Sequence, residues 1–199
     1  MQQNRLVPMT WTDLEGLFPV MQGDFPPEEL KPLRRMRQLW VQGCYDPLFA
    51  EIDGRRRGYA ILRRMEGFPY LLLDYLAIFR EERNGGYGTR TLELLKYRYG
   101  DQDGIMAEVE DPDDARDEAE RALRLRRVRF YQRAGFLPCP FPNSIFGVRY
   151  LVHVWTPEGS PSRRLAAQCL AGLYLGHWPS EPVIQTPKVF LEIPEEPQA

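Results

Sequence analysis

Residues 70–95 read YLLLDYLAIFREERNGGYGTRTLELL, an apolar strand pattern, a glycine-rich loop and the start of an apolar-periodic helix. The glycines Gly85, Gly86 and Gly88 let backbone N–H groups approach a ligand without a Cβ in the way. The helix that follows presents unpaired N–H groups and the positive end of its dipole. This order of elements predicts an anion site whose ligand is a phosphate or a pyrophosphate.

Two better-known phosphate loops do not fit this stretch. A P-loop needs a lysine after its last glycine, whereas Gly88 is followed by Thr89. A dinucleotide-binding fingerprint needs a last glycine at the position that Thr91 occupies. With these two loops excluded, the remaining pattern is Arg83-x-x-Gly86-x-Gly88 at a strand-to-helix junction.

This loop resembles the coenzyme A loop of the GNAT superfamily of N-acetyltransferases. Two later segments follow in the order of that superfamily. Residues 104–110 (GIMAEVE) read as a second core strand, and residues 130–136 (FYQRAGF) resemble its helix-end signature. The stretch from Phe25 to Gly135 also resembles a bacterial subgroup of uncharacterised GNAT proteins with an EVEDP-type strand end, here Glu108 to Pro112.

The resemblance implies an α/β fold with a central, mostly antiparallel twisted sheet of mixed type, flanked by helices. We expect an acetyltransferase domain over residues 1–156. Residues 157–199 are then a carboxy-terminal extension, a helix plus a strand, that packs on the same domain. The prolines cluster in the first quarter and the last third of the chain, where we expect the irregular structure.

The resemblance also implies acetyl-CoA as co-substrate and no metal. Backbone groups at the end of the first core strand would hold the pantetheine arm and the thioester, and the glycine loop would hold the diphosphate. The implied cofactor-binding residues are Leu76, Ala77, Ile78, Arg83, Asn84, Gly85, Gly86, Tyr87, Gly88 and Thr89.

Acetyl transfer to an amine needs a base for the amine proton and an acid or hydrogen-bond donor for the departing thiolate. Tyr131 stands at the position of the superfamily's usual general-acid tyrosine. Glu110 is the first choice for the base, with Asp74 and Glu108 as further candidates. Three of the four have a structural alternative: a salt bridge to one of the many arginines for Asp74 and Glu110, and core packing for Tyr131.

Composition bounds these expectations. A chain of 199 residues with 43% hydrophobic and 27% charged residues is ordinary for one globular domain. The net charge of −2 gives no global attraction for nucleic acid. The longest apolar run, residues 70–79, is far shorter than the ~20 residues of a membrane span. Without a secretory h-region, and with an odd number of widely spaced cysteines, we expect a cytoplasmic protein with reduced thiols.

The remaining pattern alternates strands and helices. Thr12 with Glu15 predicts a helix start at residue 12, and Asp53-Gly54 predicts the turn of a hairpin between residues 48–52 and 59–62. The arginine-rich helix expected over residues 115–133 favours a solvated face with Glu/Arg pairs over a nucleic-acid contact. The other expected elements are an edge strand at 6–9, a helix from residue 27 to about residue 40, a helix at 89–98, a strand at 148–155, a helix at 163–174 and a strand at 188–193.

These observations favour an enzyme that acetylates a primary amine by direct transfer, without an acyl-enzyme. The acceptor would be a small molecule or a peptide, and the protein a monomer or a homodimer without nucleic-acid or membrane partners. Two alternatives stay open. One is a catalytically silent GNAT-fold module that binds CoA or a protein; the other is a nucleotide-binding protein that uses the same glycines.

Overall fold

The computed structural model describes residues 4–101 and 104–195. The chain forms two compact units. Unit 1 comprises Met1–Arg64 and Leu73–Arg98, and unit 2 comprises Met65–Leu72 and Tyr99–Ala199. Strand β4 (Tyr70–Ile78) contributes its first residues to unit 2 and the others to unit 1.

The strands of unit 1 are β1 (Arg5–Pro8), β2 (Tyr45–Ile52), β3 (Arg55–Arg63) and the second part of β4, in that spatial order. Strand β2 pairs antiparallel with both β1 and β3. Asp53 and Gly54 connect β2 to β3 with φ angles of 53° and 72°, the left-handed conformation that a two-residue hairpin turn requires. The Asp53-Gly54 hairpin is therefore confirmed.

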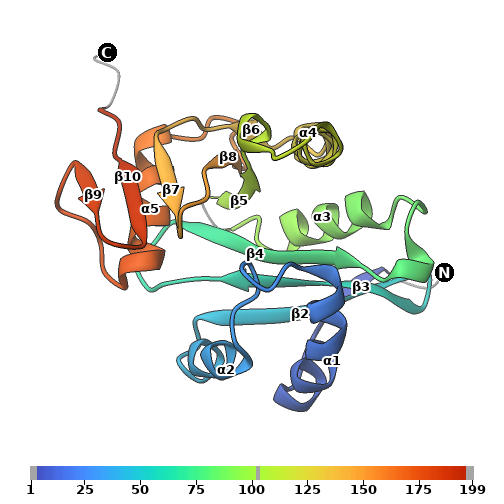
Figure 1. Cartoon of the computed structure of the whole chain (residues 1–199). Coiled ribbons are helices and arrows are strands. Elements are labelled where there is room, and N and C mark those ends of the chain that lie inside the picture. The colour runs from blue at the N-terminus through green and yellow to red at the C-terminus, as the bar shows by residue number, and fades with distance from the viewer. Residues whose placement is uncertain (1–3, 102–103, 196–199) are drawn as a thin grey trace. The chain divides into compact units, whose positions relative to one another are not determined.

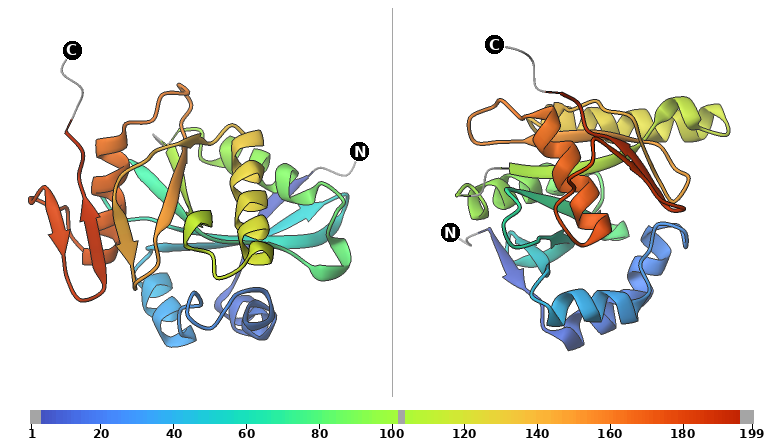
Figure 2. Two further views of the ribbon diagram at one scale, coloured as in Figure 1. Left: turned by 45° about the horizontal axis from the view of Figure 1, so that its top comes forward. Right: turned by 90° about the vertical axis from the view of Figure 1, so that its left-hand side faces the viewer.

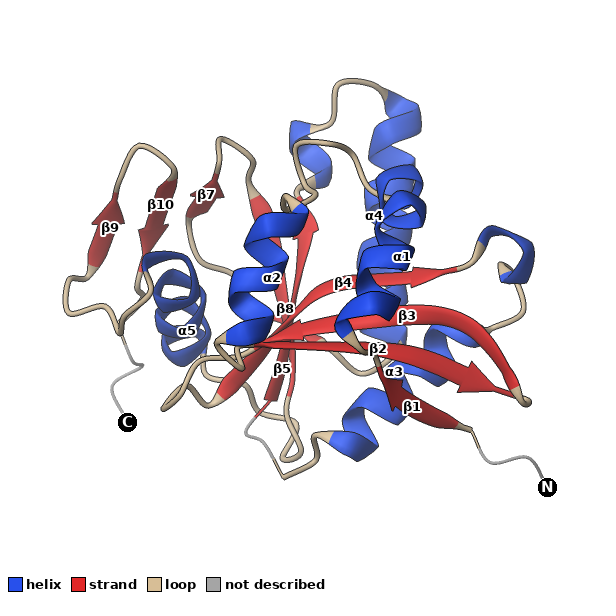
Figure 3. Cartoon of the chain, turned by 90° about the horizontal axis from the view of Figure 1, so that it is seen from below, coloured by secondary structure: helices blue, strands red, loops and turns tan. Residues whose placement is uncertain are grey.

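Helices cover both faces of the strands in unit 1. Helices α1 (Trp11–Asp24) and α2 (Leu33–Val41) lie on one face, and α3 (Tyr87–Arg98) lies on the other (Figures 1 and 3). A short 3₁₀ turn, η1 (Arg80–Glu82), precedes α3. The side chains that fill the core beneath α1 and α2 are buried and mostly large, among them Leu14, Met21, Met36, Leu39, Tyr59 and Ile61.

Helix α1 begins at a different cap from the predicted one. Its N-cap is Thr10, whose Oγ1 accepts a hydrogen bond from Asp13 N at 3.1 Å while Asp13 Oδ2 accepts one from Thr10 N at 2.9 Å. Thr12 and Glu15 repeat the same spacing two residues later, so the sequence contains two capping boxes in different registers. The earlier one is used.

The strands of unit 2 include the first residues of β4, followed by β5 (Gly104–Glu110), β8 (Tyr150–Trp155) and β6 (Leu137–Pro138). The pairing of β4 with β5 is parallel and joins residues 70–72 to residues 104–106. The pairs β5–β8 and β8–β6 are antiparallel. Helix α4 (Glu118–Arg133) follows the 3₁₀ turn η2 (Pro112–Asp114). A mostly antiparallel sheet flanked by helices was the predicted fold class, and it is confirmed.

Helix α5 (Arg163–Leu175) packs beside a second sheet made of β7 (Asn143–Ile145), β10 (Val189–Glu192) and β9 (Val183–Gln185) (Figure 2). Its buried residues share one core cluster with Leu72, Met106 and Val154 of the larger sheet. Gly172 permits this approach, since a Cβ there would lie 2.3 Å from the ring of Phe68. Helix α5 and strands β9 and β10 thus contribute to the core of unit 2.

Within the described ranges, every helix is too short or too polar to span a lipid bilayer.

Candidate functional site

The glycine-rich loop of unit 1 turns the chain from η1 into α3. Asn84 and Gly86 have φ angles of 67° and 73°, so the loop contains two left-handed positions. A Cβ on Gly85 would lie 2.5 Å from the ring of Tyr87, which explains a glycine at that position. Gly86 O accepts the first hydrogen bond of α3, from Arg90 N at 3.2 Å.

The first turn of α3 presents N–H groups to a ligand. Arg90 is the first residue of α3 whose N–H donates to a carbonyl four residues earlier. The N–H groups of the three residues before it, Tyr87, Gly88 and Thr89, therefore have no intrahelical partner. Gly88 adds no side chain at this end, where the helix dipole is positive. This geometry suits a phosphate or diphosphate group.

Arg83 binds the body of unit 1. Its Nη2 donates to Asp24 Oδ1 at 2.7 Å, and its Nε donates to Ile78 O at 3.1 Å. The Asp24 side chain is almost fully buried and also accepts a hydrogen bond from Tyr59 Oη at 2.9 Å. Burial and the carboxylate of Asp24 raise the pKa of Tyr59 well above its usual value. Arg83 therefore ties the loop to the end of α1.

Two other arginines lie beside the loop, and both contact the ring of Tyr87. The guanidinium carbon of Arg57 lies 4.6 Å from the ring centroid, and that of Arg90 lies 5.8 Å from it. Arg57 also forms an ion pair with Glu82, and Arg90 forms one with Asp53 at 2.9 Å. These contacts hold the ring of Tyr87 in place at the start of α3.

Leu76, Ala77 and Ile78, which the sequence analysis assigned to the pantetheine arm and the thioester, lie at the end of β4. These three residues are half-buried, whereas residues 70–73 are fully buried. Strand β3 approaches them closely, since a Cβ on Gly58 would lie 2.3 Å from Ala77 O. Phe79 N donates to Arg57 O at 3.0 Å, which fixes the strand end just before the loop.

Asp74 lies in the same strand and is engaged by two side chains of unit 1. Lys31 Nζ binds its Oδ1 at 2.7 Å, and the Tyr45 hydroxyl donates to its Oδ2. Burial and the neighbouring Asp74 raise the pKa of Tyr45 well above its ordinary value, so this phenol stays neutral. The partner of Asp74 is a lysine from the α1–α2 connection, and no arginine forms an ion pair with it in the described part of the chain.

Glu110 ends strand β5 in unit 2, where two arginines of α4 hold its carboxylate. Arg124 Nη2 binds Oε1 and Arg127 Nη1 binds Oε2, each at 2.9 Å. Arg124 is buried, and it also contacts Glu120 at 3.0 Å and the carbonyl of Asp111 at 2.7 Å. The Glu/Arg pairing considered from the sequence is present at this position.

Glu108, two residues earlier in β5, receives a hydrogen bond from helix α5. Tyr174 Oη donates to Glu108 Oε2 at 2.9 Å. Glu108 and Glu110 thus share a strand but bind side chains from different helices, α5 and α4 respectively. The carboxy-terminal segment thereby contacts a residue that the sequence marked as a catalytic candidate.

Tyr131 is placed by the end of α4. Phe136 N donates to Tyr131 O at 3.0 Å, and Gly135 N donates to Gln132 O at 2.9 Å, with Gly135 at a φ of 79°. These two bonds form a Schellman motif. The motif brings the rings of Tyr131 and Phe136 to 5.4 Å in an edge-on contact, and Phe130 makes a second edge-on contact at 5.1 Å.

The phenol of Tyr131 is set up as a neutral donor. Burial raises the pKa of Tyr131 to about 12, and the charge of Arg127 opposes that effect. In the part of the chain that the structure describes, its hydroxyl has no hydrogen-bond partner. A neutral, uncommitted O–H is the form that donates to a thiolate.

The acidic residues after β5 are largely neutralised. Arg149 binds Asp111 at 3.0 Å and Asp114 at 2.8 Å, and Arg121 lies 3.8 Å from Asp113. This turn therefore gives little negative potential to attract a cationic acceptor. Across residues 4–101 and 104–195, no three His, Cys, Asp or Glu side chains gather as a metal site would require.

The sequence did not reveal the partners of the candidate residues. Asp24, Lys31 and Arg124 hold Arg83, Asp74 and Glu110 respectively. The spacing of Arg124 four residues after Glu120 predicts the pair between these two residues, but it gives no signal for the pair of Arg124 with Glu110. Asp24 and Lys31 lie in irregular or helix-end positions, and no spacing rule identifies them.

Comparison with known proteins identifies the family. The acetyltransferase (GNAT) family model matches residues 14–136. A search of curated proteins found no match. A putative GNAT-family acetyltransferase from Bacteroides thetaiotaomicron is similar in structure, with 26% sequence identity, a TM-score of 0.59, and coverage of 76% of this chain and 86% of that chain.

Two further structures share the fold at lower identity. A ribosomal-protein-alanine N-acetyltransferase from Brucella melitensis has 22% identity and a TM-score of 0.53, covering 76% of this chain and 98% of its own. An aminoglycoside acetyltransferase, solved with paromomycin and acetyl-CoA, has 17% identity and a TM-score of 0.56, covering 79% and 96%. The family match spans more than half of the chain, and the chain belongs to the GNAT family of acetyltransferases.

Proposed function

We propose that this protein transfers an acetyl group from acetyl-CoA directly to a primary amine. The observation that carries the proposal is the loop before α3, where the left-handed Gly86 leads into a helix whose first N–H groups have no intrahelical partner. Such a turn binds a diphosphate through the backbone, and coenzyme A contains one. Family membership supports the same activity.

The proposed reaction is a single displacement. The neutral amine nitrogen attacks the thioester carbonyl, the C–N bond forms, and the C–S bond breaks. The amine proton passes to a base, directly or through water, and the thiolate takes a proton from an acid. We assign Tyr131 as the acid because its phenol is neutral and lacks a partner among the described residues.

We assign Glu110 as the base, with Asp74 and Glu108 as further candidates. The guanidinium groups of Arg124 and Arg127 bind the two oxygens of the Glu110 carboxylate. They also fix its orientation. Leu76, Ala77 and Ile78 are assigned to the pantetheine arm, and residues 83–89 to the diphosphate. Within that loop, Arg83 would act by fixing the loop to Asp24.

A catalytically silent CoA-binding module is the second candidate. The observation that favours it is that each of the three carboxylates already has a protein partner: Lys31 and Tyr45 for Asp74, Tyr174 for Glu108, and two arginines for Glu110. A base that stays in such pairs throughout the cycle does not remove a proton.

Turnover separates the two. We expect the purified full chain to release CoA from acetyl-CoA in the presence of at least one member of a panel of small amines and peptides, with CoA quantified by chromatography so that the protein's own thiols do not interfere. Binding of CoA without release across the panel would support the silent module. Displacement of CoA by ATP or NAD at equal concentration would instead support a general nucleotide site.

A further inference from the structure

Lys31 places a primary amine on one of the candidate bases of unit 1. Its Nζ lies 2.7 Å from Oδ1 of Asp74, and Oδ2 of the same carboxylate accepts a hydrogen bond from the Tyr45 hydroxyl. The Lys31 side chain is 21% exposed, whereas that of Asp74 is 5% exposed. A primary amine is the group that the proposed reaction acetylates, so the chain holds an acceptor group of its own beside a base.

Two neighbouring residues of β4 hold Lys31 at both of its ends. Asp74 binds the amine, and Tyr75 binds the backbone: its Oη accepts from Lys31 N at 2.9 Å and donates to Glu29 O at 2.9 Å. Lys31 Nζ also lies over the Tyr75 ring, 5.5 Å from its centroid. The α1–α2 connection is therefore fixed to the strand at this point, and the freedom left to Lys31 lies in its four-carbon stem.

Asp74 and the residues proposed to hold the thioester belong to the same strand. Leu76, Ala77 and Ile78 follow Asp74 in β4. A strand rises roughly 3.3 Å per residue, so Leu76 lies about 7 Å along the strand from Asp74. A change of rotamer in the lysine stem moves its amine through distances of that order. We therefore expect the amine of Lys31 to reach a thioester bound at the end of β4 without movement of the backbone.

The other two lysines of the chain lack this arrangement. Lys96 Nζ binds Glu93 Oε1 at 2.8 Å, but both residues lie in α3 and the Glu93 side chain is 60% exposed. Lys188, in unit 2, lies 5.8 Å from the ring centroid of Phe146. Within the described ranges, only Lys31 thus binds a carboxylate of β4. Lys96 is a built-in control, because it too is a lysine that binds a carboxylate.

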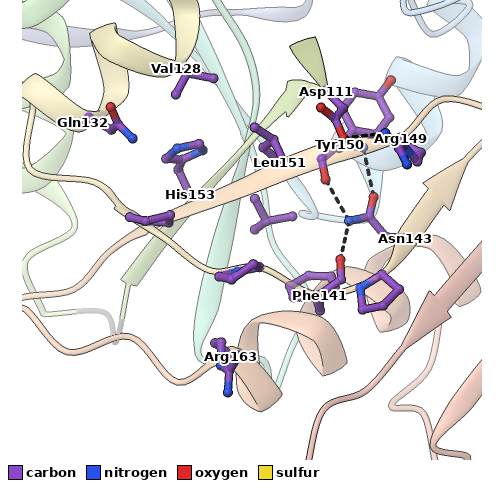
Figure 4. Close-up of a pocket in the computed structure, with 14 residues that line it drawn as sticks. Asp111, Val128, Gln132, Phe141, Asn143, Arg149, Tyr150, Leu151, His153 and Arg163 are labelled. Atoms are coloured by element: carbon purple, nitrogen blue, oxygen red, sulfur yellow. Dashed lines mark hydrogen bonds and ion pairs between the residues drawn. The ribbon is translucent and has the colours of Figure 1, made fainter. Parts of the chain in front are cut away.

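The cavity of about 430 Å³ in unit 2 supplies no further acceptor amine (Figure 4). Its charged lining residues are Asp111, Arg149 and Arg163, and no lysine is among the described residues that line it. A guanidinium group stays protonated and does not act as an acceptor amine. Asn143 holds the cavity wall together, since its Nδ2 donates to Phe141 O at 3.0 Å and to Tyr150 O at 2.8 Å. An acceptor amine within the chain is therefore found in unit 1.

We propose that the protein acetylates its own Lys31, from acetyl-CoA bound to the same chain. Self-acetylation rests on the proposed function, since it uses the same cofactor loop and the same direct transfer. The Lys31 ammonium gives one proton to Asp74, and the neutral nitrogen attacks the thioester carbon. The C–N bond forms, the C–S bond breaks, and the second proton of the nitrogen neutralises the departing thiolate. The proton on Asp74 then passes to water, and Lys31 carries a neutral amide in place of its charge.

Incubation of the full-length protein with acetyl-CoA, in the absence of any acceptor amine, tests this proposal. Tryptic digestion and mass spectrometry then report each lysine separately: cleavage at Arg5 and Arg34 releases residues 6–34, in which Lys31 is the only lysine. Because Pro32 follows Lys31, trypsin does not cut there whether or not the lysine is modified. We expect Lys31 to gain an acetyl group about tenfold faster than Lys96 and Lys188, whose slow reaction measures non-enzymatic acetylation.

Three controls link the modification to the proposed site. A large excess of CoA, which competes for the cofactor loop, should suppress acetylation of Lys31 and leave that of Lys96 unchanged. Asp74→Asn should lower the rate at Lys31 about tenfold in folded protein, whereas Glu93→Gln, which removes the partner of Lys96, should leave it unchanged. In a mixture of the wild type with ¹⁵N-labelled Gly88→Val protein, Lys31 of the wild-type chain should be modified and Lys31 of the variant should not.

The outcomes separate self-acetylation from the proposed function. Self-acetylation is excluded by an unmodified Lys31, by equal rates at Lys31 and Lys96, or by equal modification of the two chains in the mixture. Release of CoA with the amine panel while Lys31 stays unmodified leaves the proposed function in place and overturns only self-acetylation. A modified Lys31 without turnover of any panel amine has the opposite meaning: the chain acetylates itself, and transfer to an external amine fails.

Discussion

Lys31 and Asp74 form an ion pair at 2.7 Å between the α1–α2 connection and strand β4, with the carboxylate almost fully buried. The Tyr45 hydroxyl completes the cluster from strand β2, which is separated from β4 by β3. Because this pair joins a connecting segment to the centre of unit 1, Asp74 has a structural role whatever part it plays in catalysis.

We expect Asp74→Asn to lower the free energy of unfolding by about 1–3 kcal/mol, because the amide leaves the charge of Lys31 without compensation. Lys31→Met should cost a similar amount, and the double variant should cost less than the sum of the two. Chemical denaturation of the four proteins gives these values. If Asp74 is instead the base, Asp74→Asn abolishes acetyl transfer in folded protein while Lys31→Met does not.

Glu110→Gln should remove most acetyl transfer near neutral pH and recover part of it as the pH rises, because the acceptor amine then loses its proton without help. The pH dependence of kcat/KM is the measurement. Glu120→Gln is the matched control, since it also removes an ion-pair partner of Arg124 but leaves Glu110 in place. Equal losses in the two variants would assign the effect to Arg124 and exclude Glu110 as the base.

Tyr131→Phe should lower kcat by roughly ten- to a thousandfold, the range for loss of general-acid help. The ring contacts with Phe130 and Phe136 stay, and the hydroxyl has no partner among the described residues, so the free energy of unfolding should change by less than about 0.5 kcal/mol. Rate assays of acetyl transfer give kcat, and thermal denaturation of the same preparation gives the change in stability. Full activity in the variant would leave Tyr131 only its packing role in the Schellman motif.

The sequence predicted those parts of the fold that depend on residues close together in the chain. The β4–loop–α3 unit and strand β5 were predicted because glycine positions and apolar runs are local signals. Helix α2 was predicted to begin near Pro27, but it begins at Leu33, after Pro32 in an extended conformation. Strands β7 and β9 are three residues each, too short for an alternating pattern to show.

The site was predictable where backbone alone determines it. Gly86 needs its left-handed conformation whatever surrounds it, so the loop could be read from the sequence. The side-chain partners could not: Arg83 and Asp24 are 59 residues apart, and Asp74 and Lys31 are 43 apart. A chain with 26 basic and 28 acidic residues offers many pairings of that kind, and only the folded structure selects among them.

Gly88→Val should abolish CoA binding while the protein stays folded, because a branched side chain in the first turn of α3 blocks close approach of a diphosphate to the backbone. Gly16→Val is the control: Gly16 is an exposed helix glycine whose Cβ would contact nothing within 4 Å. Calorimetric titration with CoA should show wild-type affinity for the control. Wild-type affinity in folded Gly88→Val as well would refute the loop assignment.

His153 should make the protein less stable in mild acid. Its pKa in the folded state lies below the usual value of about 6.5, so the unfolded chain takes up the proton first as the pH falls through that value. The free energy of unfolding therefore decreases below pH 6.5, by at most about 1.4 kcal/mol per pH unit, until the folded-state pKa is reached.

Urea denaturation between pH 7.5 and 5.5 measures this slope in a range where Arg149 and Arg163 stay charged and ordinary carboxylates stay ionised. His153→Gln should flatten the slope even if it lowers stability at every pH. An unaltered slope in His153→Gln would show that the buried imidazole does not set the acid sensitivity.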